Sequence, residues 1–175
     1  PAVIADLQRD ARVVSAQPNY LYTLAQAAAA PGAQSAAVSG GQPDLYSTQY
    51  TVGKLQLREA HAIAKGEQVL VAVIDSGIDA AHPELSGAVV KQIDVVGEKD
   101  RMPHAHGTAM AGAIVARSQL MGVAPAAKLL AIKAFAATNA AKGSGTTFNL
   151  IQAIDRAVEE KARVINLSFA GPADP

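Results

Sequence analysis

With 50% hydrophobic and 17% charged residues, the 175-residue chain is too apolar for a disordered tail and long enough for one globular domain. Its 15 basic and 15 acidic side chains cancel, so the sequence lacks the positive surface that binding to nucleic acid or to an anionic membrane requires. No apolar stretch is long enough to span a membrane, and the absence of cysteine excludes disulfides, thiolate metal sites and a cysteine nucleophile.

The N-terminal part of the chain divides into a short module and a linker. In residues 1–26, residues 2–7 have helical spacing and residues 11–16 are strand-like, but the module is too short to fold alone. Residues 27–48 are rich in alanine, glycine, glutamine, serine and proline, which predicts a flexible linker. Residues 49–175 therefore form the main folded unit.

Strands and helices alternate along this unit. Continuous apolar runs are typical of strands buried on both faces, and the segments between them have helical periodicity. We therefore expect an α/β fold with a doubly wound, mostly parallel sheet. The predicted strands are residues 68–74, 88–96, 128–135 and 164–169, and the predicted helices are residues 55–64, 108–116 and 150–158. The apolar face predicted for the last helix consists of Leu150, Ile151, Ile154, Ala157 and Val158.

Asp75 is the first candidate for a functional residue. In open α/β sheets, ligands bind beyond the carboxyl ends of the strands, and Asp75 directly follows the apolar run 69–74. It is followed by Ser76 and Gly77, and taken by its position alone an aspartate here is more typical of a turn or a helix cap.

His106 is the second candidate. A histidine at the start of a small-residue helix can act as a general base, and the small residues let that helix approach a strand closely. The alternative is a surface histidine in the loop 103–106. A metal site at His104 and His106 is not predicted, because residues 107–109 add no further ligand.

Two further segments offer backbone edges to which an extended peptide could add as a strand, although each taken singly could be an ordinary loop. They are Gly143, Ser144 and Gly145 before the last predicted helix, and Ser168, Phe169 and Ala170 at the end of the last predicted strand.

Taken in order, these segments resemble the subtilisin-like serine proteases, the subtilases of peptidase family S8. The similarity covers about residues 50–172 and consists of an aspartate box, a histidine box, the strand after the histidine helix, and the substrate-binding strand. The matching segments are residues 71–79 with 82–85, residues 106–112, residues 122–125 with 129–133, and residues 164–172.

The resemblance assigns roles to the candidate residues. It implies that Asp75 orients His106, which takes a proton from a serine hydroxyl and returns it to the leaving amine. It also implies that residues 143–145 and 168–170 hold a polypeptide substrate as an added antiparallel strand. Ala170 departs from the glycine common in the family, which adds a methyl group beside the substrate backbone.

Residues 1–26 resemble the end of the inhibitory propeptide that many subtilases carry. This implies a zymogen whose own propeptide is a binding partner, with a maturation cut in or near the linker. It also implies a secreted or cell-envelope location, although the first residues lack the pattern of a signal peptide.

The serine box of the family is missing from residues 1–175. None of the serines weighed as a nucleophile stands in a strand-to-helix elbow, namely Ser76, Ser118, Ser144 and Ser168. The asparagine donor of the oxyanion hole is also expected further downstream. We therefore expect a subtilisin-like fold that is incomplete at its C-terminal side, inactive alone, and partnered by the missing part of the catalytic domain.

Two alternatives remain open. The chain could be a natural truncated relative that binds peptides or partners without catalysis, or a phosphoryl-transfer domain using Asp75, for which a glycine-rich phosphate loop is lacking. No cofactor is predicted. Calcium stabilises many subtilases, but the loop 116–122 offers few oxygen ligands, with Glu84 the main carboxylate in reach.

Overall fold

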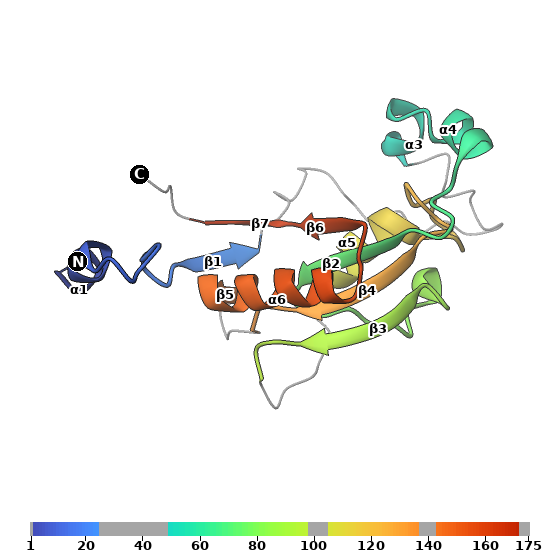
Figure 1. Ribbon diagram of the computed structural model, residues 1–175. Helices are drawn as coiled ribbons and strands as arrows, with labels where there is room; N and C mark the ends of the chain where they lie inside the picture. Colours follow the sequence, from blue (N-terminus) through green and yellow to red (C-terminus); the bar gives the residue numbers. More distant parts are fainter. Residues whose placement is uncertain (1, 25–48, 98–104, 137–142, 172–175) are drawn as a thin grey trace.

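The centre of the fold is a four-stranded parallel sheet in the order β3-β4-β2-β6 (Figure 1). This computed structural model describes residues 2–24, 49–97, 105–136 and 143–171. The prediction of an α/β fold with a mostly parallel sheet is confirmed. The strands are β2 (Leu70–Asp75), β3 (Val89–Asp94), β4 (Lys128–Lys133) and β6 (Val164–Leu167), each close to its predicted position.

Helices cover both faces of this sheet, because alternate side chains of each strand point to opposite sides. Helix α6 (Thr147–Glu159) packs on one face and α5 (Ala105–Val115) on the other, so the sheet is doubly wound as predicted. The first core contains Ala72, Ile74, Leu130, Ile132, Leu150, Ala153 and Ala157, and the second contains Val71, Val73, Ala111, Val115, Leu129 and Ala131.

A second, antiparallel sheet has the order β5-β1-β7. It consists of β1 (Leu21–Leu24) between β5 (Ser144–Thr146) and β7 (Phe169–Ala170). Both β5 and β7 lie more than 100 residues after β1 in the sequence, and they pair with its two opposite edges.

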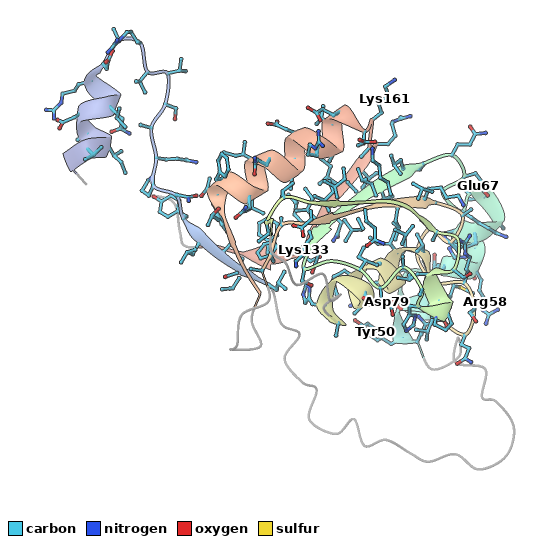
Figure 2. The ribbon with its side chains drawn as sticks, turned by 90° about the horizontal axis from the view of Figure 1, so that it is seen from below. Tyr50, Arg58, Glu67, Asp79, Lys133 and Lys161 are labelled. Atoms are coloured by element: carbon cyan, nitrogen blue, oxygen red, sulfur yellow. The ribbon has the colours of Figure 1, made fainter. Side chains whose placement is uncertain are left out.

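The N-terminal module differs from the prediction in one element. Helix α1 (Ala2–Arg9) forms where helical spacing predicted it and stands clear of both sheets in the two views (Figure 2). The strand predicted at residues 11–16 is wrong, because this segment pairs with no strand of the described chain and Val14 is fully exposed. The strand of this module is β1, because Leu24 can be buried there. The predicted linker, residues 27–48, lies outside the described residues.

The helix predicted over residues 55–64 is confirmed as α4 (Leu57–Ile63). A further short helix that was not predicted, α3 (Tyr50–Lys54), precedes it, and Gln56 between them has a left-handed backbone conformation with φ of 51°. In α6, the face that meets the sheet is narrower than predicted. Of the five residues predicted to be buried, Leu150 and Ala157 are buried, whereas Ile151, Ile154 and Val158 are exposed.

Strand β6 forms one edge of the sheet in the described residues and β3 forms the other. On β6, Val164 and Leu167 are 51% and 47% exposed. Within the same ranges, no helix is both long and apolar enough to cross a membrane.

The loop after α5 is held by Glu84, a residue of the 3-10 helix η1 (Pro83–Leu85) that is 7% exposed. Its carboxylate accepts hydrogen bonds from the backbone N–H groups of Ser118 at 3.0 Å, Gln119 at 2.7 Å and Leu120 at 3.2 Å. Burial raises the pKa of Glu84, but these bonds together outweigh it, so the net pKa is lower than usual.

Glu84→Gln is expected to lower the free energy of unfolding at pH 7 by about 1–3 kcal/mol, since it weakens hydrogen bonds to a buried charged group. Because the pKa of Glu84 is depressed in the folded state, its stabilisation is present above the ordinary glutamate pKa of about 4.3 and is lost as the pH falls through the folded value. Urea unfolding between pH 3 and pH 7 measures this. The exposed Glu59→Gln is the control, and an equal, pH-independent loss in both variants would contradict the prediction.

Candidate active site

Asp75 is the last residue of β2 and is fully buried at the carboxyl end of the sheet. Its Oδ1 atom accepts hydrogen bonds from the backbone N–H of Ser76 at 2.7 Å and from Ser76 Oγ at 3.0 Å. Two hydrogen-bond donors of Ser76 therefore converge on one oxygen of this carboxylate.

His106 lies in the first turn of α5 and faces this carboxylate. Its Nδ1 atom is 2.9 Å from both Oδ1 and Oδ2 of Asp75, and its side chain is 12% exposed. Because a carboxylate is an acceptor only, it selects the neutral tautomer in which Nδ1 carries the proton. The Nε2 atom, on the far side of the ring, is then an acceptor that can take a proton from a substrate or nucleophile.

Gly107 permits the close approach of α5 to the end of β2. A Cβ atom on Gly107 would lie 2.2 Å from the carbonyl oxygen of Gly77 and 3.1 Å from Asp75 Oδ1. The small residue after His106 is therefore a condition for the contact between His106 and Asp75.

The two peptide-pairing segments flank β1. Of the predicted substrate-binding residues, Ser144 and Gly145 lie in β5 and Phe169 and Ala170 lie in β7. Gly143 adjoins β5, and its carbonyl accepts from the Leu24 N–H at 3.4 Å. Ser168 lies between β6 and β7, where its Oγ accepts from Asn166 Nδ2 at 2.9 Å.

Successive side chains of β1 point alternately toward solvent and into the core. Thr23 is opposite Ala170 and Leu24 is opposite Phe169. Tyr22 and Leu24 pack against the core, whereas Leu21 and Thr23 are exposed.

An aromatic cluster receives Tyr22. Its ring meets Phe169 edge-on with centroids 5.7 Å apart, and Phe169 stacks at a tilt on Phe135 at 5.1 Å. A Cβ on Gly171 would lie 2.3 Å from the Tyr22 ring. The extended segment β1 thus lies between the paired edges of β5 (Ser144–Thr146) and β7 (Phe169–Ala170), with a large side chain at position 22. We call this place between the two edges the groove.

The chain before β1 also binds the N-terminus of α6. The Asn19 side-chain oxygen accepts from the Phe148 N–H at 3.1 Å, and the Tyr20 carbonyl accepts from the Thr147 N–H at 3.0 Å. These contacts satisfy N–H groups that lack partners within the helix. The sequence prediction missed both β1 and this cap, although the strand-forming residues Leu21–Leu24 carried a signal for the strand.

No group of three or more histidine, aspartate or glutamate side chains in the described ranges is arranged to hold a metal ion. His104, which was weighed as a metal ligand, lies outside these ranges. The described residues thus contain an acid–base pair, Asp75 and His106, and an antiparallel sheet in which the extended segment β1 pairs with β5 and β7.

Comparison with known proteins agrees with this arrangement. Residues 66–174 match the subtilase family, peptidase S8, and the chain belongs to this family. Thermitase of Thermoactinomyces vulgaris is 35% identical over 74% of this chain and 47% of its own length. The thermophilic serine proteinase of Bacillus sp. strain AK1 is 34% identical over 96% of this chain and 40% of its own length.

A solved structure has the same fold. The nisin leader peptidase NisP from Lactococcus lactis superposes with a TM-score of 0.62 and 24% identity, over 73% of this chain and 39% of that protein. The major intracellular serine protease of Bacillus subtilis is 38% identical over 63% of this chain and 36% of its own length. The chain spans less than half the length of these relatives.

Proposed function

We propose that this chain is part of a serine endopeptidase of the subtilisin type. The observation that carries the proposal is the 2.9 Å contact between His106 Nδ1 and the buried Asp75 carboxylate. In this mechanism His106 takes the proton of a serine hydroxyl through Nε2 and delivers it to the leaving amine, while Asp75 stabilises the imidazolium ion.

The nucleophilic serine and the asparagine of the oxyanion hole belong, in this proposal, to a further segment of the catalytic domain. The half-exposed Val164 and Leu167 on edge strand β6 support it, because a following strand would cover them. Residues 1–175 alone are then inactive. Of the serines nearest the pair, Ser76 already donates to Asp75 and Ser168 accepts from Asn166.

The substrate is a polypeptide bound as an extended strand. Residues 143–145 and 168–170 are the proposed substrate-binding residues, and the pairing of β1 with β5 and β7 supports this assignment.

Residues 1–26 act in this proposal as the end of an inhibitory propeptide, followed by the linker 27–48 and the catalytic part 49–175. The support is that β1 occupies the groove that a substrate would use. Such a zymogen fits a secreted or cell-envelope protein. Similarity alone does not indicate export, because two similar proteins are named as intracellular serine proteases. The proposal of export therefore rests on residues 1–26.

A second function is favoured by the occupied groove itself. A domain that binds extended peptides without cleaving them needs β5 and β7 but no serine.

Labelling the full-length protein with a fluorophosphonate, which reacts with activated serines, separates the two functions. We expect one labelled serine in a segment other than residues 1–175, and loss of casein hydrolysis on labelling. If the full-length protein neither reacts nor hydrolyses casein, the protease proposal is wrong and the binding function stands.

A further inference from the structure

Ser76 links the Asp75 carboxylate to the backbone of the residue that follows His106. It is 2% exposed, and its Oγ donates to Asp75 Oδ1 at 3.0 Å while accepting from the backbone N–H of Gly107 at 3.3 Å. Its own N–H donates to the same carboxylate oxygen at 2.7 Å.

The direction of these bonds follows from the chemistry of the groups. An N–H can only donate, so the Gly107 N–H fixes Ser76 Oγ as its acceptor and the hydroxyl proton is directed to the carboxylate. Gly107 is in the first turn of α5, where N–H groups lack partners within the helix. One hydroxyl thus ties the carboxylate to the backbone of the residue that follows His106.

We propose that Ser76 is a positioning residue that fixes the orientation of the Asp75 carboxylate and thereby holds His106 in its Nδ1–H tautomer. The inference rests on the proposed function, since the tautomer matters for catalysis because it leaves Nε2 as the base. Without the hydroxyl, Oδ1 loses one donor and the carboxylate gains rotational freedom about its χ2 angle.

The chain provides a matched control. Thr108 Oγ1 accepts from the Asp79 N–H at 3.0 Å, so it too ties α5 to the segment after β2. The two hydroxyls differ in that the one on Ser76 bonds Asp75 directly. Thr108→Ala therefore loosens a comparable tie to α5 without removing the Ser76 bond to the carboxylate.

Nitrogen-15 NMR of the histidine-labelled 175-residue chain at alkaline pH tests the inference, because the two imidazole nitrogens report the tautomer. The His106 signals are those absent from the spectrum of His106→Ala, and circular dichroism checks that each variant folds. We expect Ser76→Ala to lower the ratio of the Nδ1–H form to the Nε2–H form by about fivefold. This is the change in an equilibrium constant that corresponds to the loss of one ordinary hydrogen bond. Ser76→Thr, which keeps the hydroxyl, restores the ratio, and Thr108→Ala leaves it unchanged.

An unchanged ratio in folded Ser76→Ala overturns the inference, as does an equal shift in Thr108→Ala. These outcomes are independent of peptide hydrolysis. If the tautomer responds as expected but the full-length protein hydrolyses no peptide, the proposed function is wrong and the positioning role of Ser76 stands.

Discussion

His106→Ala in the full-length protein is expected to lower kcat for peptide hydrolysis by about a million-fold, with KM nearly unchanged. The magnitude is the one known for subtilisin itself and does not come from the geometry described above. The physical reason is that no other group then accepts the serine proton while the tetrahedral intermediate forms. Asp75→Asn keeps the shape of the site but offers an amide to Nδ1, and we expect a loss of about ten-thousand-fold.

Steady-state kinetics on a chromogenic peptide checks both values, with fluorophosphonate titration to count active sites in the wild type and circular dichroism to check that the variants fold. His61→Ala is the control, because His61 lies in α4 and contacts the carbonyl of Val123 rather than Asp75. The kcat of His61→Ala should stay within about twofold of the wild-type value, because surface substitutions away from a site have small effects. Retention of most of the activity by His106→Ala would rule out the proposed role of this histidine.

The parallel sheet could be predicted because its strands carry their own signal. Every residue of β2 before Asp75 is apolar, and a strand of this kind is stable when both of its faces are covered. The position of Asp75 at the carboxyl end then follows from the chain direction. Its contact with His106, 31 residues away, was implied by the family resemblance, because spacing alone does not bring two residues together.

The wrong predictions concern features that are determined by contacts between residues far apart in the sequence. In α6, Leu150 and Ile151 are adjacent on the helix surface, and which of them meets the sheet depends on how the helix rotates against Ala72 and Leu130. The strand predicted at residues 11–16 has suitable residues, but Leu21–Leu24 has partners in β5 and β7. The role of Ser76 was missed for the same reason, since its contact with Gly107 joins the end of β2 to α5. The close approach that Gly107 permits was predicted from the small residues after His106.

The double variant Tyr22→Ala/Leu24→Ala is expected to release β1 from the groove. Leu24 is 5% exposed and Tyr22 packs against Phe169, and truncating such side chains costs about 2 kcal/mol or more each. Hydrogen exchange of the β1 amides that pair with β5 and β7 should therefore become about 100-fold faster or more, while the amides of β2 and β4 keep their protection.

The matched control is Leu21→Ala/Thr23→Ala, which truncates the two exposed side chains of the same strand. If backbone pairing alone held β1, both double variants would exchange alike, and the proposed selection of large side chains in the groove would be wrong. If only the inward pair matters, a full-length protein with Tyr22→Ala/Leu24→Ala should also hydrolyse peptides faster before maturation than the unaltered zymogen. That result would connect the burial of two side chains to inhibition, because the same groove cannot hold β1 and a substrate at once.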